Sequence, residues 1–457
     1  MTFENTNVKL ADLSTDVSYG YTASANAQKV GPKFLRITDI QGGVVDWDEV
    51  PYCEIDAKKL LKNKLNAGDV VVARTGNSTG ENYLYSYSEE AVFASYLIRF
   101  RINPELANPY FVWLQMRGQR WWDYVAGSKS GSAQAGANAK VLGQFEFFLP
   151  ERKVQDDVAK IFFEINEKIK LNNQTNQTLE QIAQAIFKSW FVDFEPVKAK
   201  MAVLEAGGTA EQAELAAMSA ISAKDEAALK QLQAEQPDAY AELAKTTALF
   251  PSVMVDSELG EIPEGWDTLP LDEIAHYQNG LALQKFRPKN ENEFLPVVKI
   301  AQLKKGFADA EEKASPDIKP ECIIDDGDVV FSWSGSLVVD IWCGGKAALN
   351  QHLFKVTSET YPKWFYHHFT KHHLAEFQRI AADKAVTMGH IKREHLASAK
   401  CAIPTDDILL KGTELIGSLL EKQTQQRLET NTLAETRDSL LPKLLSGDLP
   451  ITNTEVA

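Results

Sequence analysis

The sequence predicts an α+β protein in which two tandem domains of mixed α/β structure are joined by two long antiparallel helices with pseudo-two-fold symmetry. Three observations support this prediction: the chain length, an internal repeat and two long amphipathic segments. The 457 residues exceed what one hydrophobic core usually organises. Because 44% of the residues are hydrophobic and 24% are charged, the composition is that of an ordinary folded protein.

The internal repeat has an offset of 254 residues. At this offset Pro150 aligns with Pro404 and Pro196 aligns with Pro450, without a gap between them. Further upstream the copies align with small shifts, since the string GDVV at 68–71 recurs at 327–330. A period of this length indicates a duplicated unit that consists of a globular part followed by a helical part.

The helical part of each copy is a long amphipathic segment. Apolar residues recur at steps of three and four along 151–190 and again along 405–446. About 40 residues of helix form a rod of roughly 60 Å. Because neither rod has a globular core of its own, we expect the two helices to pack on each other as an antiparallel pair.

These patterns predict six segments. They are 1–150, the first mixed domain; 151–196, the central long helix; 197–256, an Ala-rich helical insertion or linker; 257–404, the second mixed domain; 405–449, the C-terminal long helix; and 450–457, a tail. The Ala-, Glu- and Gln-rich composition of the insertion predicts one or two extra helices, with a disordered linker as the alternative.

The net charge of −15 is the main objection to nucleic-acid binding, which normally requires a basic surface. By segment the charge is −1 for 1–150, −6 for 151–256, −4 for 257–404 and −4 for 405–457. Since most of the excess lies outside the two globular stretches, each of these can still present a local basic face.

The sequence shows no catalytic, cofactor or metal motif. It has no phosphate-binding loop, no dinucleotide fingerprint and no nucleophile elbow. Four well-separated cysteines argue against a zinc ribbon and a disulfide framework. His368 and His372 have ligand spacing, but they lack the intervening Glu and a third ligand, so we expect a polar helix face here rather than a metal site.

Two loop regions in each globular stretch carry groups suited to base edges and phosphates. A solvated turn is the alternative for each loop taken alone, and their recurrence at matching places in both copies favours a functional role. The candidate residues are Arg74, Thr75, Asn77, Ser78, Lys129, Ser130, Ser132, Gln134, Asn138 and Lys140 in the first copy, and Trp333, Ser334, Ser336, Lys384, Thr387, His390, Lys392 and Arg393 in the second.

Several strings resemble the specificity subunits of type I restriction-modification systems. They are GDVVVARTGNSTG (68–80), NQTLEQIAQAIFKSWFVDFEPVKAKM (176–201), SELGEIPEGW (257–266), GDVVFSWSGS (327–336), LNQHLFKV (349–356), TMGHIKREHL (387–396) and RDSLLPKLLSGDL (437–449). The resemblance covers essentially the whole chain. One departure is the start NVKLADLS, which lacks the Pro-x-Gly-Trp of 263–266 and leaves the beginning of the first domain uncertain.

The resemblance implies two target-recognition domains, each reading one half of a bipartite, asymmetric DNA target. The partners it implies are double-stranded DNA, two methyltransferase subunits gripped by the long helices, and endonuclease/translocase subunits. S-adenosylmethionine and the methylation of adenine N6 would belong to the methyltransferases, and ATP with Mg to the endonuclease subunits, so the chain itself would be a non-catalytic protein. Because the sequence has no run of about 18 apolar residues and its N-terminus does not resemble a signal peptide, we expect a cytoplasmic protein. The polar stretch 172–178 would fix the register of the helices, with methyltransferase docking as a second possibility.

Two other functions are consistent with the bulk composition. A helical adaptor whose globular units bind protein would suit the acidic charge. A self-sufficient nuclease is disfavoured because its motifs are absent.

Overall fold

The computed structural model describes residues 6–128, 137–383 and 389–446. These residues form two compact units. Unit 1 consists of the described residues up to Ile169 together with those from Leu433 onward, and unit 2 is Lys170–Thr432. The expected positions Lys129, Ser130, Ser132 and Gln134, together with Lys384 and Thr387, lie outside the described residues.

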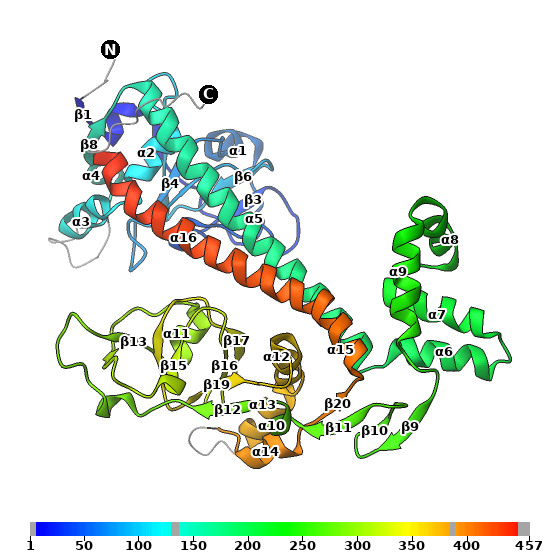
Figure 1. Cartoon of the computed structure of the whole chain (residues 1–457). Helices are drawn as coiled ribbons and strands as arrows, with labels where there is room; N and C mark the ends of the chain where they lie inside the picture. Colours follow the sequence, from blue (N-terminus) through cyan, green and yellow to red (C-terminus); the bar gives the residue numbers. More distant parts are fainter. Residues whose placement is uncertain (1–5, 129–136, 384–388, 447–457) are drawn as a thin grey trace, which may run out of the picture. The chain divides into compact units, whose positions relative to one another are not determined.

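A four-stranded antiparallel sheet organises the first domain in unit 1 (Figure 1). Its order is β2-β7-β4-β5, with β2 (Ser14–Tyr19), β4 (Asp69–Ala73), β5 (Asn82–Leu84) and β7 (Leu97–Ile102). Strand β4 is buried along its whole length, and Val70 and Val71 belong to different core clusters. This alternation is expected of a central strand, because successive side chains point to opposite faces of the sheet.

The other elements of the first domain surround this sheet. Strands β1 (Thr6–Lys9) and β8 (Glu146–Leu149) pair antiparallel, and β3 (Lys33–Leu35) pairs parallel with β6 (Ala91–Phe93). The helices are α1 (Ala57–Asn63), α2 (Pro109–Gln115), α3 (Gln119–Ser128) and α4 (Ala139–Leu142). Residues of α2 and α3, such as Phe111 and Trp121, share a core cluster with the sheet.

The second domain repeats this sheet with the same strand order. In β12-β19-β16-β17 the strands are β12 (His276–Asn279), β16 (Val329–Ser332), β17 (Val339–Ile341) and β19 (Leu353–Thr357). The repeated order confirms the tandem mixed domains predicted from the sequence.

The remaining elements of the second domain form further sheets and short helices. The strands are β9 (Met254–Ser257), β10 (Gly260–Pro263), β11 (Asp267–Pro270), β13 (Leu295–Val298), β14 (Lys313–Ala314), β15 (Ile323–Ile324), β18 (Ala347–Leu349) and β20 (Lys400–Ile403). The helices are α10 (Leu271–Ile274), α11 (Ile300–Lys305), α12 (Lys363–His372), α13 (Leu374–Asp383) and α14 (Arg393–Ser398).

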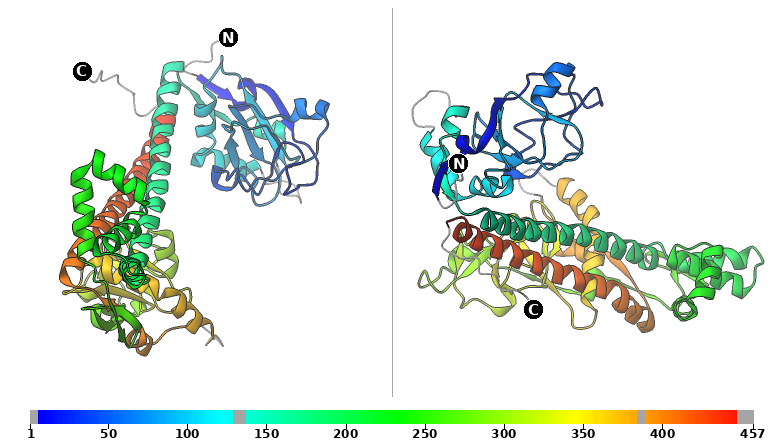
Figure 2. Two further views of the ribbon diagram at one scale, coloured as in Figure 1. Left: turned by 90° about the vertical axis from the view of Figure 1, so that its right-hand side faces the viewer. Right: turned by 90° about the horizontal axis from the view of Figure 1, so that it is seen from above.

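Two long helices run from one unit into the other. They are α5 (Arg152–Phe191) and α16 (Ser418–Ser446); α15 (Asp406–Gly412) leads into α16 through a π-helical turn over Thr413–Gly417. Figure 2 shows α5 and α16 side by side. Neither of them, nor any other described helix, is long and apolar enough to cross a membrane.

Polar contacts fix the direction of the helix pair within each unit. In unit 1 Arg437 Nη1 donates to Asn166 Oδ1 at 3.0 Å. In unit 2 Asn172 Nδ2 donates to Glu429 Oε2 at 2.9 Å, and Gln423 Nε2 donates to the Asn176 carbonyl at 3.3 Å. Since partners on α16 descend in number as those on α5 ascend, the pairing is antiparallel. Asn172 and Asn176, from the polar stretch, therefore make inter-helix contacts.

The insertion between the domains is a four-helix element. Its helices are α6 (Glu195–Glu205), α7 (Ala210–Ser222), α8 (Glu226–Glu235) and α9 (Pro237–Ala248). The expectation of one or two helices was too low, and the alternative of a disordered linker was wrong. The ammonium of Lys200, which is 3% exposed, holds the element together by donating to Glu214 and to the carbonyls of Thr247 and Phe250.

Candidate nucleic-acid interface

The first candidate loop of the first domain follows β4. Gly76 has φ +68°, a conformation that favours glycine, and it allows the chain to turn directly after Arg74. The Arg74 guanidinium lies 5.0 Å from the centre of the Tyr19 ring, and its Nε donates to the Ser95 carbonyl at 3.2 Å. These two contacts hold the half-exposed guanidinium at the end of the sheet.

The rest of this loop differs in exposure from residue to residue. Thr75 and Ser78 are half-buried and Asn77 is exposed. The Ser78 hydroxyl accepts from Gln41 Nε2 at 3.1 Å, whereas Thr79 is buried and donates to the Gly76 carbonyl. The loop therefore has internal support and presents Asn77 to solvent.

The second candidate loop of the first domain meets the first one. The Ala137 amide donates to the Arg74 carbonyl at 3.0 Å. Asn138 caps α4 by accepting from the Val141 amide at 2.9 Å, so its side-chain oxygen already has a structural partner. Lys140 is exposed in the same short helix.

The candidate loops of the second domain also lie together. The Gly335 amide donates to the Gly389 carbonyl at 2.8 Å, and Ser334 and His390 form a β-bridge. Trp333 packs edge-to-face on His390, with ring centres 6.4 Å apart. Ser336 and His390 are exposed, whereas Ser334 is only 3% exposed.

Polar side chains at this second site are largely engaged within the protein. The Ser334 hydroxyl is 2.9 Å from His352 Nδ1. Arg393 donates to the Tyr277 carbonyl at 3.0 Å, and Lys392 forms an ion pair with Glu394 at 3.2 Å. The buried Ser334 therefore stabilises the loop through its contact with His352 and is not presented to solvent.

A common backbone frame holds the loops in both domains. The amides of Arg74 and Trp333 donate to the carbonyls of Tyr96 and His352, at 3.1 and 3.3 Å. The carbonyls of the same two residues accept from Ala137 and Ile391, at 3.0 Å in each case. The frames match although an Arg occupies the position in one domain and a Trp occupies it in the other.

Sequence reasoning missed three residues at these sites. Tyr19 and Tyr96 flank Arg74 and are 43% and 56% exposed, and the Tyr19 hydroxyl accepts from the Ala139 amide. His352 supports Ser334 in the second domain. The available signal was the repeat itself, because Tyr96 directly precedes β7 and His352 directly precedes β19, the equivalent strand of the second domain.

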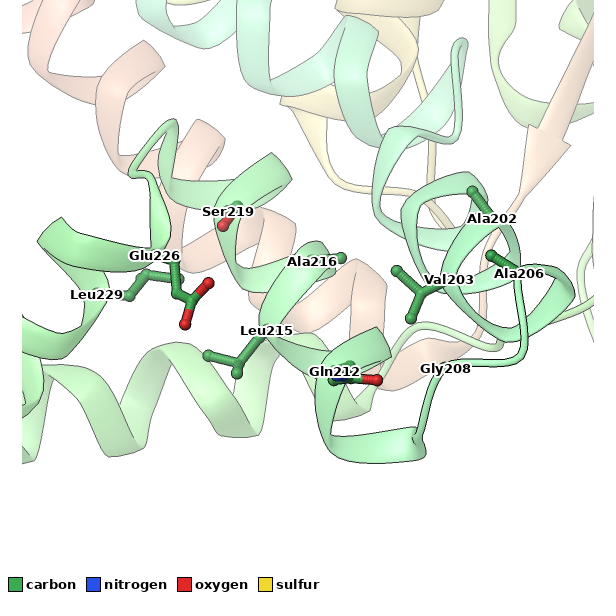
Figure 3. Close-up of a pocket in the computed structure, with 10 residues that line it drawn as sticks. All are labelled: Ala202, Val203, Ala206, Gly208, Gln212, Leu215, Ala216, Ser219, Glu226 and Leu229. Carbon is green, nitrogen blue, oxygen red and sulfur yellow. The ribbon is translucent and has the colours of Figure 1, made fainter.

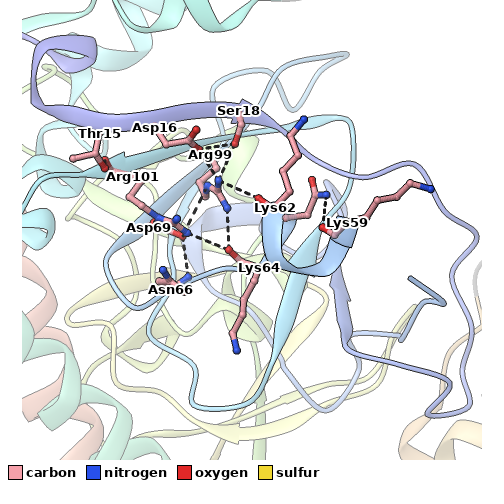
Figure 4. A network of polar contacts seen from close by, with 11 residues as sticks. Thr15, Asp16, Ser18, Lys59, Lys62, Lys64, Asn66, Asp69, Arg99 and Arg101 are labelled. Atoms are coloured by element: carbon pink, nitrogen blue, oxygen red, sulfur yellow. Dashed lines mark hydrogen bonds and ion pairs between the residues drawn. The ribbon is translucent and has the colours of Figure 1, made fainter. Parts of the chain in front are cut away.

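A buried ion network stabilises the sheet beneath the first site (Figure 4). Asp69, 2% exposed, accepts from Arg101 Nε and Nη2 at 2.8 Å. Arg99, 3% exposed, donates to Asp16 and to the Lys64 carbonyl. Although burial alone would raise the pKa of Asp16, the hydrogen bonds from Arg99 and Ser18 lower it.

The second domain contains a counterpart of this network. Lys355 Nζ lies 2.8 Å from Asp328 and donates to the Ile323 carbonyl at 2.9 Å. Asp69 and Asp328 each also accept from the backbone amide three residues earlier, that of Asn66 and that of Asp325. The duplication thus extends to the charged side chains that fix the strands.

Two of the three histidines of α12 are buried, and His372 is exposed. His367 and His368 are 3% and 2% exposed, and the His368 ring packs against Phe187 of α5. Burial lowers the pKa of both imidazoles and brings that of His373 to about 4. The expectation of a polar face was wrong for His367 and His368, which are buried, the latter against Phe187 of α5. Within the described part of the chain no three potential metal ligands come together.

A groove lies in the insertion, which contains none of the candidate loops. It has a volume of about 590 Å³. Figure 3 shows Val203 of α6, Leu215 of α7 and Leu229 of α8 along it, with the Glu226 carboxylate beside them. A lining of mostly small and apolar residues, with one carboxylate and no basic side chain, does not suit a phosphate backbone.

Comparison with known proteins agrees with this architecture. The type I restriction enzyme HindI specificity subunit of Haemophilus influenzae is 27% identical over 461 residues, covering 96% of this chain and 98% of the relative. The MjaIX specificity subunit of Methanocaldococcus jannaschii is 22% identical over 401 residues, covering 86% of this chain and 77% of the relative. The crystal structure of a type I restriction-modification S subunit from M. genitalium shares the fold, with a TM-score of 0.54 at 11% identity over 98% of this chain and 96% of that one.

The family described as "Type I restriction modification DNA specificity domain" matches residues 5–181 and 263–435. The two matches coincide with the two copies of the internal repeat. Because they span well over half of the sequence, the chain belongs to the family of type I restriction-modification DNA specificity proteins.

Proposed function

We propose that this chain is the DNA-specificity subunit of a type I restriction-modification complex, which reads a bipartite, asymmetric target and docks two methyltransferase subunits. One observation carries the proposal: equivalent loop pairs in the two domains share a backbone frame but present different side chains. Two domains with the same loop backbone but different exposed side chains are suited to a DNA target whose two halves differ in sequence.

The side chains of the two frames support different readouts. Arg74 offers a guanidinium, which can fork onto the O6 and N7 of a guanine or bind a phosphate. Trp333 at the equivalent position has no guanidinium and its indole N–H is buried, so the second half-site must be read mainly by other groups on its loops. The exposed candidates there are Ser336, His390, Lys392 and Arg393. A palindromic target is therefore not expected.

The chain supplies recognition, and its partners supply chemistry and most of the positive charge. With a net charge of −15, the chain needs methyltransferase subunits to neutralise much of the DNA phosphate. S-adenosylmethionine is assigned to those subunits, and ATP and Mg to endonuclease/translocase subunits, because the sequence has no loop that would hold either cofactor. The chain is accordingly a non-catalytic subunit.

The alternative of a protein-binding adaptor is distinguished by the salt dependence of DNA binding. Phosphate contacts release counterions, so the binding constant should fall steeply as salt rises. A complex that binds its DNA target with no such slope, or that fails to bind any DNA, would favour the adaptor.

The most direct test maps methylated adenines in cells that carry the methyltransferase partner with and without this chain. We expect one bipartite motif that disappears when the chain is absent. A motif that persists without the chain would contradict the proposal. A variant in which residues 257–404 are replaced by the same segment of a relative is the matched control, and it should change only one half of the motif.

A further inference from the structure

The second domain contacts the long helices at several places inside unit 2, and two of these contacts differ in character. The first is an apolar anchor. Phe369 of α12 packs edge-to-face on Phe187 of α5, with ring centres 4.9 Å apart, and Trp364 packs on Phe191 at 5.3 Å. These rings are at most 4% exposed, so this anchor is part of the hydrophobic core.

The second anchor is polar and lies on α16. Arg427 Nη1 and Nη2 donate to Asp340 Oδ1 and Oδ2 at 2.8 and 2.9 Å, which is a bidentate pair. One turn further on, Asn431 Nδ2 donates to the Cys343 carbonyl. Asp340 lies on the edge strand β17, and Cys343 follows two residues after this strand ends. We call these four residues the polar clamp.

The clamp lies where α16 passes into the other unit. Asn431 is one residue from Thr432, the last residue of unit 2. The apolar anchor contacts the π-helical turn that precedes α16, near Ile416. Ile416 is 15 residues before Asn431 along the helix, a distance of about 22 Å. Leu420 and Leu428 of α16 also belong to or pack against the core cluster of the second domain, and the clamp adds a directional contact at the far end of this apolar surface.

A small rotation of the second domain about the apolar anchor would move its candidate loops to a different base pair of the DNA. A displacement of about 3.4 Å, one base-pair rise, requires a rotation of only about 9° over 22 Å. The clamp residues are also suited to hold an angle, since a bidentate pair fixes direction as well as distance. With 29% and 35% of their side chains exposed, Arg427 and Asp340 form a contact that can open without disrupting the core.

We propose that Arg427 and Asp340, supported by Asn431, are positioning residues that fix the length of the unread gap between the two half-sites. They touch no DNA in this role and act by setting the angle of the second domain on α16. This inference rests on the proposed function, since it assumes that both domains read DNA.

The test is methylome sequencing of Arg427→Asp and Asp340→Arg in the complex with the methyltransferase partner. We expect both half-sites to keep their bases while sites with a gap one base pair shorter or longer become methylated, at least tenfold above their level with the unaltered chain. The double variant Arg427→Asp/Asp340→Arg should restore the single gap. Lys289→Asp, which breaks the exposed ion pair of the second domain with Asp317, is the matched control and should change nothing.

The outcomes separate this inference from the proposed function. If the unaltered complex methylates no bipartite target, the proposed function fails. If it does, and the single variants keep the original gap or lose methylation at all gaps equally without rescue by the double variant, the positioning role is wrong. A panel of duplexes with gaps one base pair apart, tested for binding to Asn431→Ala, gives a second readout that does not depend on expression level.

Discussion

Trp364 Nε1 donates to Thr413 Oγ1 at 2.9 Å, at the turn where the C-terminal helix changes from α to π geometry. The Thr413 hydroxyl in turn donates to the Leu409 carbonyl at 2.9 Å. Gly412 lies against the Trp364 ring, where an added Cβ would be 2.6 Å from ring carbons. The second domain is thus joined to the helix by an indole ring that fits against a glycine.

Replacing Gly412 with alanine should destabilise unit 2 by about 1–3 kcal/mol, because overpacking outweighs the gain in helix propensity. Urea unfolding measures the effect. Gly118→Ala is the control, since a Cβ there would meet nothing within 4 Å. Equal stability of the two variants would mean that the Trp364 contact is loose.

The ion network predicts different effects at equivalent aspartates. Asp69→Asn should lower the free energy of unfolding by about 3 kcal/mol. It leaves Arg99, which is 3% exposed, and the neighbouring Arg101 without a buried carboxylate. Asp328→Asn, at a carboxylate that is 25% exposed, should cost about 1 kcal/mol or less. Free energies of unfolding from denaturant titration compare the two, and equal losses would contradict the burial argument.

The buried histidines predict that stability falls on mild acidification. His367, His368 and His373 have folded-state pKa values lowered by burial, that of His373 to about 4. The unfolded chain therefore takes up protons first as the pH falls below about 6.5. The stability that these neutral imidazoles contribute is complete above that pH and falls as the pH drops below it, and for His373 the loss is complete near pH 4. The slope is up to about 1.4 kcal/mol per pH unit for each histidine.

Denaturant unfolding between pH 7.5 and 5 measures this slope. His373→Asn should reduce it by removing one titrating group. A flat profile for the unaltered chain would show that these imidazoles are not buried in solution.

Arg74→Ala should weaken DNA binding in one of two distinguishable ways. If Arg74 forks onto a guanine, discrimination at one base pair falls by roughly 1–3 kcal/mol, whereas loss of a phosphate contact weakens all sequences evenly. Binding to duplexes with single substitutions separates these outcomes. Lys58→Ala, at an exposed lysine of α1, is the control. No loss of either kind would remove the loop after β4 from the interface.

Patterns along the chain were sufficient to predict the tandem domains and the long helices. The 254-residue offset and the apolar stripes can be recognised in the sequence without knowledge of the contacts between distant segments. The loop hydrogen bonds that the two domains share follow from the duplication. The burial of Ser334, His367 and His368 could not be predicted in this way. The surroundings of these polar side chains come from distant segments, such as His352 for Ser334 and Phe187 for His368, so local polarity suggested exposure where the fold buries them.

The structure also defines where the helical spacer can be lengthened. An insertion within unit 2, for example after Gln177, would separate the apolar anchor of the second domain from the polar clamp. Partners across the helix pair, Asn166 with Arg437 and Asn172 with Glu429, place the position after Ile169 opposite the position after Thr432. Matched insertions there keep both sets of contacts intact.

We propose above all that the long helices hold the two DNA-reading domains at a fixed distance from each other. The most direct test is to map the methylated sites produced by a chain with four residues inserted after Ile169 and four after Thr432. One extra turn in each helix adds about 6 Å, close to two base-pair rises. We expect the bases of both half-sites to stay the same while the gap between them lengthens by one or two base pairs. Altered bases with an unaltered gap would contradict the claim and show that the long helices are not the spacer.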